Sequence, residues 1–382
     1  MYRRHQASNE GNLSTVRPSC SLERVPNSEM PAQHGISMVM PILNEERHLA
    51  ESVDAILAQD WSGPIEIILA LGPSTDATDD VAAQLHAVDQ RIKLVFNPSG
   101  RTPKALNVAI AHASHDIVCR VDGHGILSPD YLTTAVRTLN ETGAANVGGT
   151  MDPEGTTDLE RAVACAMKSK LGVGDVKFKL GGDAGPAETV YLGVFRRSWL
   201  ERVGGYDERF SRAQDWEMNF RLRADGGVVW FTPAMRVAYR PRGTFAALAK
   251  QYREYGQWRR VLARQHKRSI NVRYLTPPTA LAAIAAGILV GFAWRPLWVI
   301  PATYAGVVTV GGVAISRGET PAVYARVPAV LATMHLSWGW GFLTSRIRFS
   351  DDVQNYTQQQ PGSLTGIDRR VRVCPTTTVQ RN

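Results

Sequence analysis

Cysteine is scarce in this sequence: its 382 residues contain four, and none of them pair at C-x-x-C spacing. A small secreted domain held by disulfides needs a denser framework, and a structural zinc site needs closely spaced ligands, so both are excluded. We therefore expect the globular part to lie in a reducing, cytosolic compartment. The four cysteines are Cys20, Cys119, Cys165 and Cys374.

Other familiar signals are missing as well. No G-x-G-x-x-G follows the first predicted strand, which excludes a nicotinamide-dependent dehydrogenase. No RNA- or DNA-binding signature accompanies the net charge of +8, so we expect no nucleic-acid partner. Residues 1–33 are polar and have no apolar run, so we expect no ordinary signal peptide and treat 1–34 as disordered.

Apolar strands and helices alternate from residue 36 to about residue 121. Such alternation is typical of a parallel α/β sheet covered by helices on both faces, which binds ligands at the carboxyl ends of its strands. Beyond it, a glycine-rich loop at 181–186 is either a plain connection or a lid over an acceptor site. The predicted strands are 36–41, 65–70, 92–96, 117–121, 188–196 and 228–231, and the predicted helices are 45–59, 76–87, 103–112, 129–141 and 158–171.

Asp122 and His124 stand at the tip of the buried strand 117–121, where a ligand would bind. Ser128-Pro129-Asp130 follows and is a good helix start. A carboxylate and an imidazole suit one divalent ion that bridges to a diphosphate. Asp-Gly is also a common turn, so this stretch taken alone favours a simple turn.

Polar clusters at the ends of the other strands and further along the chain make a functional site the better interpretation. The clusters are Pro41-Ile42-Leu43-Asn44-Glu45-Glu46, Ser74-Thr75-Asp76-Ala77-Thr78, Asn97-Pro98-Ser99-Gly100-Arg101 with Lys104 and Asn107, Val121-Asp122-Gly123-His124, Gln214-Asp215-Trp216-Glu217, and Gly256-Gln257-Trp258-Arg259. In order and spacing, they resemble glycosyltransferase family 2, in the branch typified by the succinoglycan-biosynthesis glucosyltransferases. That branch carries Val-Asp-x-His in place of Asp-x-Asp and ends in Gly-x-Trp-Arg plus membrane spans. The resemblance covers roughly residues 35–345.

The resemblance implies a GT-A fold: a Rossmann-like nucleotide-diphospho-sugar transferase domain at 35–245, followed by transmembrane helices. It implies Mn²⁺ or Mg²⁺ held by Asp122 and His124, and Asp215 as the general base of an inverting transfer. Trp258 would stack on an acceptor sugar and Arg259 would close over the diphosphate. The residues expected around the nucleotide-diphosphate sugar donor are Pro41, Asn44, Glu45, Asp76, Arg101, Lys104 and Asn107.

Structural alternatives stay open at most of these positions. Asn44, Glu45, Asp76 and Asp215 could simply cap helices. A cation near the diphosphate would help the leaving group, but spacing does not decide between Arg101 and Lys104, and both could be surface cations. Asn107 could be an ordinary polar residue of a helix, and Trp258 and Arg259 could be interfacial anchors.

Two positions depart from the family pattern. Leu71 stands where members usually carry an aspartate that contacts the base, which leaves the identity of the base open. Gln214 replaces a glutamate, so one carboxylate remains where two are usual. The segment around Gln251 and Trp258 lacks the spacing of the Gln-x-x-Arg-Trp signature, so we do not expect processive polymerisation.

Basic and apolar segments close the sequence. A basic amphipathic stretch at 246–275 precedes apolar segments at 277–294, 297–316 and 327–343, the last being either a span or an interfacial helix. We expect two to three transmembrane helices within 276–345, a disordered tail at 346–382, and a multi-pass protein of the cell membrane. The positive charge places the catalytic domain on the cytosolic side.

The expected function is an inverting, metal-dependent glycosyltransferase. It would move a sugar from a nucleotide-diphosphate donor to a lipid-linked saccharide or a polysaccharide precursor. Two alternatives remain: a polyprenyl-phosphate sugar synthase, and a non-catalytic scaffold that binds sugar nucleotides.

Overall fold

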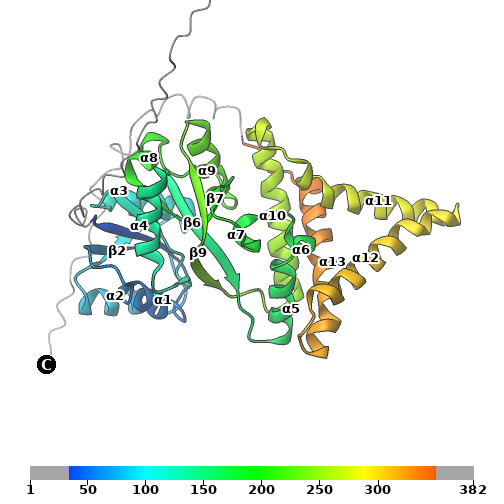
Figure 1. Cartoon of the computed structure of the whole chain (residues 1–382), viewed down its shortest axis with the longest axis horizontal. Coiled ribbons are helices and arrows are strands. Elements are labelled where there is room, and N and C mark those ends of the chain that lie inside the picture. The colour runs from blue at the N-terminus through cyan, green and yellow to red at the C-terminus, as the bar shows by residue number, and fades with distance from the viewer. Residues whose placement is uncertain (1–33, 350–382) are drawn as a thin grey trace, which may run out of the picture. The chain divides into compact units, whose positions relative to one another are not determined.

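One mixed sheet of nine strands organises the computed structural model, which describes residues 34–349 (Figure 1). Its strand order is β3-β2-β1-β4-β8-β6-β9-β5, and β7 pairs with β9. The predictions for residues 1–33 and 350–382 lie outside the described residues. The strands are β1 (Ile36–Ile42), β2 (Ile65–Leu71), β3 (Ile92–Phe96), β4 (Ile117–Arg120), β5 (Ile126–Leu127), β6 (Asn146–Pro153), β7 (Gly185–Pro186), β8 (Tyr191–Arg196) and β9 (Val229–Tyr239).

The first four strands lie where the sequence places them and run parallel, which confirms the α/β prediction for this half. Beyond β4 the sheet is mixed, because β8 runs antiparallel to both β4 and β6. The chain between β6 and β8 passes through helices, a loop and β7, and re-enters the sheet in the opposite direction. The carboxyl ends of β1, β2 and β4 meet at one edge, where ligands bind in such sheets.

Helices cover both faces of the sheet. Side chains of β1 alternate between two cores: Met38 and Met40 pack beneath one helical layer, and Val39 packs beneath the other. The predicted helix 45–59 begins only at Leu49, because the chain turns between Glu45 and His48. The first layer consists of α1 (Leu49–Leu57), α2 (Thr78–Val88) and α4 (Tyr131–Thr142); the second consists of α3 (Thr102–His112), α8 (Arg197–Arg202) and α9 (Gln214–Ala224).

An ion pair between buried Glu66 and half-exposed Lys93 links β2 to β3. The Glu66 carboxylate receives Lys93 Nζ at 2.5 Å, the Ser37 hydroxyl at 2.5 Å and the Ser114 backbone N–H at 2.5 Å. Burial by itself raises the pKa of Glu66, but the hydrogen bonds from Lys93, Ser37 and Ser114 outweigh it and lower the pKa to about 2. The charged form of Glu66 is therefore favoured in the folded protein.

Glu66→Gln is expected to lower the free energy of unfolding by about 1–3 kcal/mol at pH 7, because it removes the charge that binds half-exposed Lys93 and weakens the hydrogen bonds from Ser37 and Ser114. The folded pKa lies below the ordinary value of 4.5, so the stabilisation is complete above about pH 4.5 and fades as the pH falls toward 2. Melting temperatures of wild type and variant at pH 7 and pH 3.5 test this, with exposed Glu141→Gln as the control. If the melting temperatures of wild type and Glu66→Gln differed by the same amount at pH 7 and at pH 3.5, the lowered pKa of Glu66 would be contradicted.

A third core joins the sheet domain to the C-terminal helices. Here α13 (Pro321–Thr344) packs along α10 (Phe245–Gln265) and against α5 (Asp158–Met167). Val327, Val330 and Leu331 of α13 are fully buried in this core. The third apolar segment, 327–343, is thus packed against the protein along one side. Two short helices complete this region, α6 (Lys170–Val173) and α7 (Lys177–Leu180).

Part of the basic stretch has a structural task. Arg260 donates to the Phe342 carbonyl at 2.8 Å, and Arg264 donates to the Ile347 carbonyl at 2.9 Å. These carbonyls lie at and just beyond the C-terminal end of α13, where cations are favoured by the helix dipole. Two arginines that the sequence assigned to the membrane surface therefore cap a helix.

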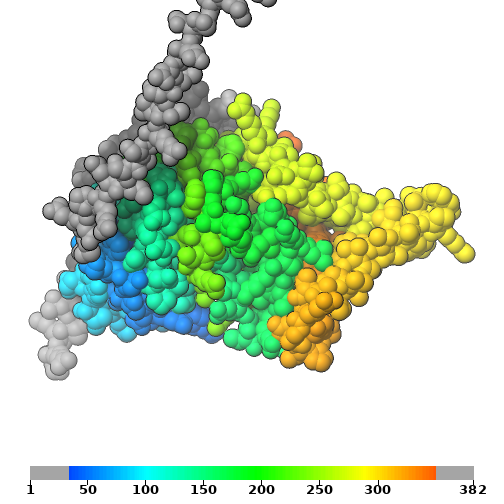
Figure 2. Space-filling model, in the orientation of Figure 1, coloured from blue at the N-terminus to red at the C-terminus, as the bar shows by residue number. Residues whose placement is uncertain are grey.

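An apolar hairpin extends beyond this core (Figures 1 and 2). It consists of α11 (Thr276–Gly291), a short turn at Arg295–Trp298 and α12 (Val299–Ile315). Large apolar side chains on it are exposed, for example Leu289 at 72%, Phe292 at 77% and Val310 at 72%. Among the described residues, one helical stretch, Arg295–Ile315, is long and apolar enough to cross a membrane, and α11 is shorter. The prediction of two to three spans is therefore not confirmed.

Candidate active site

Two loops at the carboxyl edge of the sheet are tied together. Asn44, with φ of +57°, accepts a hydrogen bond from the Thr75 backbone N–H at 2.8 Å, and the Glu46 N–H donates to Asp76 at 3.3 Å. Asp76 also accepts from the backbone N–H and the hydroxyl of Thr78, and this lowers the pKa of Asp76. Asp76 thus shapes the turn into α2, although the N-cap position itself belongs to Ala77, and its contact with the donor stays a prediction.

A buried arginine lies at the centre of the site. Arg120 ends β4 with its side chain 4% exposed, and its guanidinium binds two carboxylates. Nη2 lies 2.9 Å from Asp122 Oδ1, and Nη1 pairs with Asp215 Oδ1. Arg120 therefore joins two acidic residues that are distant in the sequence and that the sequence assigned to different tasks.

The two carboxylates respond differently to this shared cation. Burial favours a higher pKa for Asp122, but the charge of Arg120 dominates and lowers the pKa of Asp122. For Asp215 burial prevails, and the pKa is raised despite Arg120. Two neighbouring carboxylates with opposite shifts are suited to different roles, one as a permanent anion and one as a group that handles a proton.

Asp215 lies in the first turn of α9, and the N-cap position belongs to Ala213, with φ of +59°. The alternative that Asp215 is the N-cap is therefore wrong. Its carboxylate lies at the positive end of the helix dipole and is aimed at Arg120, so its partner is in β4.

His124 faces the loop after β1. Its Nδ1 lies 2.7 Å from Glu45 Oε1, and this hydrogen bond raises the pKa of His124. Gly123, between Asp122 and His124, allows the close approach, since a Cβ there would lie 2.8 Å from Glu45 Cγ. No group of three or more His, Cys, Asp or Glu side chains suited to a metal occurs within residues 34–349.

The donor set suits a metal that takes its remaining ligands from phosphate oxygens. Asp122 uses Oδ1 for its hydrogen bonds with Arg120, and its charged form is favoured. With Nδ1 of His124 held by Glu45, Nε2 is the ring nitrogen oriented for a ligand, as in carboxylate–histidine–metal arrangements. A carboxylate and an imidazole are ligands that divalent ions accept.

The three residues expected at the diphosphate sit differently. Arg101 donates to the Arg209 carbonyl and the Ser211 hydroxyl, both at 3.3 Å, and is exposed; Lys104 pairs with Glu208 at 3.2 Å. Asn107, by contrast, is buried, and its amide both donates to the Tyr206 carbonyl at 2.8 Å and accepts from the Tyr206 N–H at 2.7 Å. We therefore assign Asn107 to the loop that carries Tyr206 and withdraw its expected donor contact.

Trp258 and Arg259 are also engaged inside the protein. The Trp258 ring packs against Phe210 at 5.9 Å. Arg259 is 7% exposed, and its guanidinium lies 3.4 Å from the Tyr274 ring centroid and 4.2 Å from that of Trp216. Burial lowers the pKa of Arg259 to about 10. The expectation that Arg259 closes over the diphosphate does not fit this sandwiched position.

Sequence reasoning overlooked two residues of the site. Arg120 is an arginine at the end of an otherwise apolar strand, which was an available signal, since a buried charge requires partners. Tyr206 lies with its ring centroid 6.0 Å from the Arg120 guanidinium, and its buried hydroxyl has no hydrogen-bond partner among residues 34–349. Pro41, which the sequence did select, is the sixth residue of β1 and pairs with Ala70.

Comparison with known proteins agrees with this geometry. Residues 37–204 match the family described as glycosyl transferase family 2. The chain is 32% identical to the succinoglycan biosynthesis protein ExoA of Rhizobium meliloti, over 82% of this chain and 95% of that protein. It is 23% identical to a dolichyl-phosphate-saccharide diacetamido-dideoxy-glucuronosyltransferase of Methanococcus voltae, over 82% of this chain and 97% of that protein.

A solved structure shares the fold. The mannosyltransferase PcManGT of Pyrobaculum calidifontis, in complex with GDP-Man and Mn²⁺, is 20% identical with a TM-score of 0.56, over 83% of this chain and 89% of that one. This likeness supports the GT-A-like fold. Because of the family match and the extended similarity to ExoA, we conclude that this chain belongs to glycosyltransferase family 2 and is a hexosyltransferase that uses a nucleotide-sugar donor.

Proposed function

We propose that this enzyme transfers one sugar, with inversion, from a nucleotide-diphosphate donor to a lipid-linked acceptor at the cytosolic face of the cell membrane. The observation that carries the proposal is the pair of carboxylates held by one buried arginine, Asp122–Arg120–Asp215. It brings an anion suited to the donor diphosphate site and a carboxyl group suited to proton transfer into one site.

The donor would lie along the loops that follow β1 and β2. Asn44 and Glu45 would border the nucleoside, and two cations, exposed Arg101 and partly exposed Lys104, would face the diphosphate. Asp122 and His124 would hold Mn²⁺ or Mg²⁺, with Glu45 orienting the imidazole. When bound, such an ion neutralises charge that develops on the leaving diphosphate.

Asp215 would remove the proton from the acceptor hydroxyl as that oxygen attacks the anomeric carbon. Its pKa is raised by burial, which moves it toward the range useful for a general base. Arg120 would hold the carboxylate in place between turnovers. Because a single attack from the face opposite the diphosphate inverts the anomeric centre, one base is sufficient and the glutamine at 214 is tolerated.

The apolar hairpin supports the membrane part of the proposal. An exposed apolar surface of this kind is unfavourable in water and favourable in lipid. We assign 35–245 to the GT-A domain, 246–275 to the juxtamembrane segment and 276–345 to the membrane-associated region. The basic residues before α11 favour a cytosolic start of the hairpin.

Membranes that contain the protein, offered a panel of labelled sugar nucleotides, test the function. Label should pass from one donor into the lipid extract, and chelation of divalent ions should stop it. Transfer onto a polyprenyl phosphate carrying no sugar would identify a polyprenyl-phosphate sugar synthase instead. Donor binding without transfer to any lipid would favour the non-catalytic scaffold and refute the proposal.

The topology can be tested by cysteine labelling in a variant that lacks the native cysteines. We expect Arg295→Cys, at the hairpin turn, to react with an impermeant reagent added outside, and Arg317→Cys, after α12, to be protected. Arg317 is preferred to Gly318, whose φ of +90° disfavours any side chain. The reverse pattern, or release of the protein by alkaline carbonate, would contradict a hairpin that crosses the membrane.

A further inference from the structure

A cavity of about 420 Å³ lies between β6, β9 and the glycine-rich loop that follows α7. Its charged lining comprises three cations, Lys168, Lys179 and Arg236, and one carboxylate, Asp152. The carboxylate is already engaged, because Lys168 Nζ lies 2.6 Å from Asp152 Oδ1. Two positive charges, those of Lys179 and Arg236, are left without a carboxylate from the lining.

Lys179 is the clearer of the two cations that have no carboxylate partner in the cavity lining. Its Nζ lies over two aromatic rings, 6.0 Å from the ring centroid of Phe178 and 5.8 Å from that of Tyr255. Burial lowers the pKa of Lys179 to about 8, and no ion pair with a carboxylate offsets this within residues 34–349. Lys179 is partly exposed at the cavity, so its ammonium is accessible to an anion that enters there.

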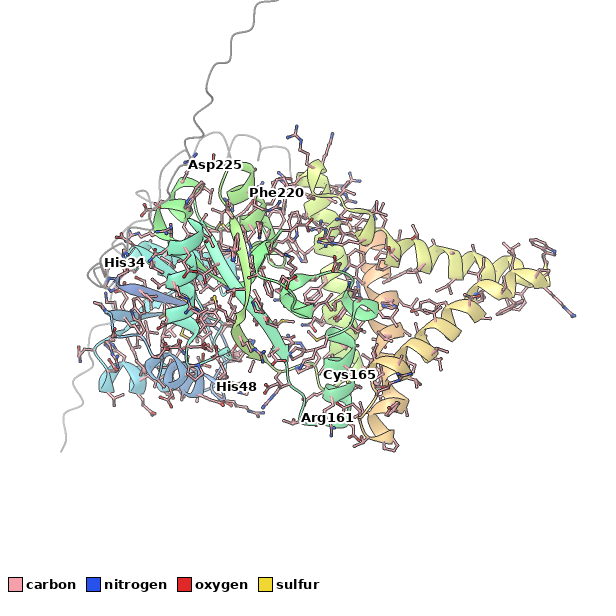
Figure 3. The ribbon with its side chains drawn as sticks, in the orientation of Figure 1. His34, His48, Arg161, Cys165, Phe220 and Asp225 are labelled. Carbon is pink, nitrogen blue, oxygen red and sulfur yellow. The ribbon has the colours of Figure 1, made fainter. Side chains whose placement is uncertain are left out.

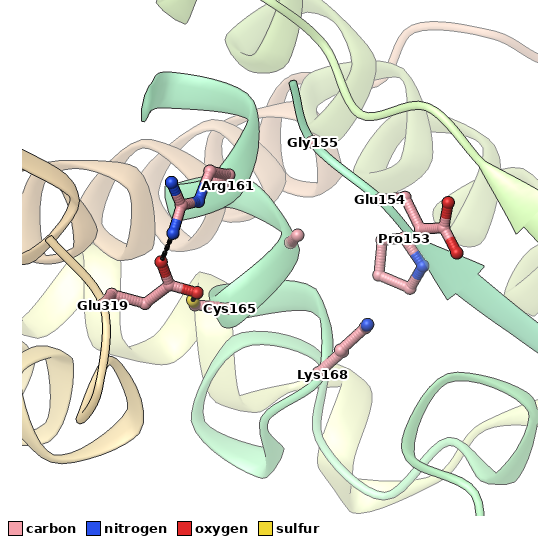
Figure 4. Close-up of a pocket in the computed structure, with 8 residues that line it drawn as sticks. Pro153, Glu154, Gly155, Arg161, Cys165, Lys168 and Glu319 are labelled. Atoms are coloured by element: carbon pink, nitrogen blue, oxygen red, sulfur yellow. Dashed lines mark hydrogen bonds and ion pairs between the residues drawn. The ribbon is translucent and has the colours of Figure 1, made fainter. Parts of the chain in front are cut away.

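A second cavity, of about 290 Å³, shares Lys168 with the first and leads toward the hairpin. Arg161 and Cys165 of α5 line it, and Arg161 pairs with Glu319 (Figures 3 and 4). Glu319 lies in the connection between α12 and α13. Charged residues therefore line a path from Lys179 to Glu319, at the end of the apolar hairpin. When the hairpin is embedded in the membrane, Glu319 lies at the depth of the lipid headgroups.

An aromatic stack and a glycine-rich loop surround Lys179. Tyr191 stacks on Phe178, the neighbour of Lys179, with ring centroids 6.2 Å apart. Tyr191 lies on β8, which pairs with β6 of the cavity wall through Gly149. Gly181 and Gly182 line the cavity with φ of +78° and +109°, and no atom of residues 34–349 lies within 4 Å of a Cβ built at either, so the loop has room to adjust.

We propose that the cavity around Lys179 and Arg236 binds the phosphate group of a lipid-linked acceptor. The phosphate would be held at the membrane surface while the sugar hydroxyl reaches Asp215. This rests on the proposed function and deepens it, since it names an acceptor carried on a polyprenyl diphosphate and a subsite for its charge. Two cations near one phosphate form charge-assisted hydrogen bonds that a neutral polyprenol cannot make.

Lysine protection tests the subsite without any turnover. The full-length protein in phosphatidylcholine nanodiscs, with EDTA and without donor, is labelled with an amine reagent at pH 8, and labelling of Lys179 is compared with that of exposed Lys250 on α10. We expect polyprenyl diphosphate to slow labelling of Lys179 about tenfold and to leave Lys250 unchanged. Equal protection by polyprenol, or by phosphatidylglycerol, would overturn the proposal.

Substitutions of Lys179 and Arg236 provide a second test of the phosphate subsite. Lys179→Gln and Arg236→Gln should each raise the KM for a lipid-linked acceptor about tenfold, with donor binding unchanged, whereas Lys250→Gln should have no effect. Lys179→Arg should restore most of the affinity. Because Lys179 has no carboxylate partner in the described part of the chain, Lys179→Gln should not lower the melting temperature, so a loss of binding would not be a loss of folding.

The two arms separate the subsite from the function on which it rests. Wild-type transfer together with unprotected Lys179 and normal KM in the variants would refute the subsite alone. Protection of Lys179 by polyprenyl diphosphate, in a protein that transfers no sugar to any lipid, would support the subsite and refute the proposed transfer.

Discussion

Asp215→Asn is expected to lower the turnover number by about 10²–10⁴, while the affinity for the donor changes little. The amide retains an oxygen that can accept from Arg120, so the first turn of α9 keeps its geometry. It cannot take the proton of the acceptor hydroxyl, however, and the attack loses its base. Steady-state kinetics with saturating acceptor give the turnover, and equilibrium binding of the donor gives the affinity.

The control for Asp215→Asn is Asp225→Asn, the same change at an exposed carboxylate beyond α9 that pairs with Arg202. It should leave turnover near the wild-type value. Near-normal turnover in Asp215→Asn would mean that another group takes the proton. Equal losses in both variants would mean that the effect arises from α9 as a whole and not from the base.

Asp122→Ala is expected to reduce transfer by at least ~10²-fold, because it removes an anion and proposed metal ligand from the diphosphate site. Of the two carboxylates that Arg120 binds, Asp122→Ala leaves Asp215. Arg120 then no longer bridges the two sides of the site. His124→Ala should be milder, about tenfold, and should raise the Mn²⁺ concentration needed for half-maximal rate. Titration of Mn²⁺ in wild type and both variants measures this.

Two outcomes would contradict the assignment of Asp122. Full activity of either variant in EDTA would remove the metal from the account. A loss of transfer in Asp122→Ala accompanied by a large fall in melting temperature would mark Asp122 as a partner that stabilises Arg120. Asp122→Asn, which keeps a hydrogen-bond acceptor for Arg120, separates the two effects because it should fold normally and still lose rate.

The sequence predicted the parallel half of the sheet well, since short apolar strands between helices allow few other folds. Strands β1 to β4 and helices α2 and α3 lie within about two residues of their predicted bounds. The antiparallel insertion of β8 between β4 and β6 was not predicted, because pairing between distant strands leaves no local mark in a sequence.

Motif spacing identified Asp122, His124 and Asp215 as candidates but gave no contacts among them. Arg120 bridges the two carboxylates because the first turn of α9 lies beside the end of β4. Such tertiary contacts cannot be read from motif spacing. Asn107 and Arg259 illustrate the opposite error: polar residues of suitable chemistry are buried and hydrogen-bonded within the protein. Asn107 and Arg259 differ from Arg101 and Lys104 in solvent exposure, and the spacing of residues in a sequence does not predict exposure.

The anomeric configuration of the product tests the central claim most directly, because that claim is a single displacement assisted by one base, Asp215. Wild-type enzyme would be supplied with a donor whose sugar–phosphate bond is α, and the new glycosidic bond in the lipid product would be assigned by NMR coupling constants. The account predicts a β-linked product. An α-linked product would require a second displacement or a different attacking group, and would contradict it.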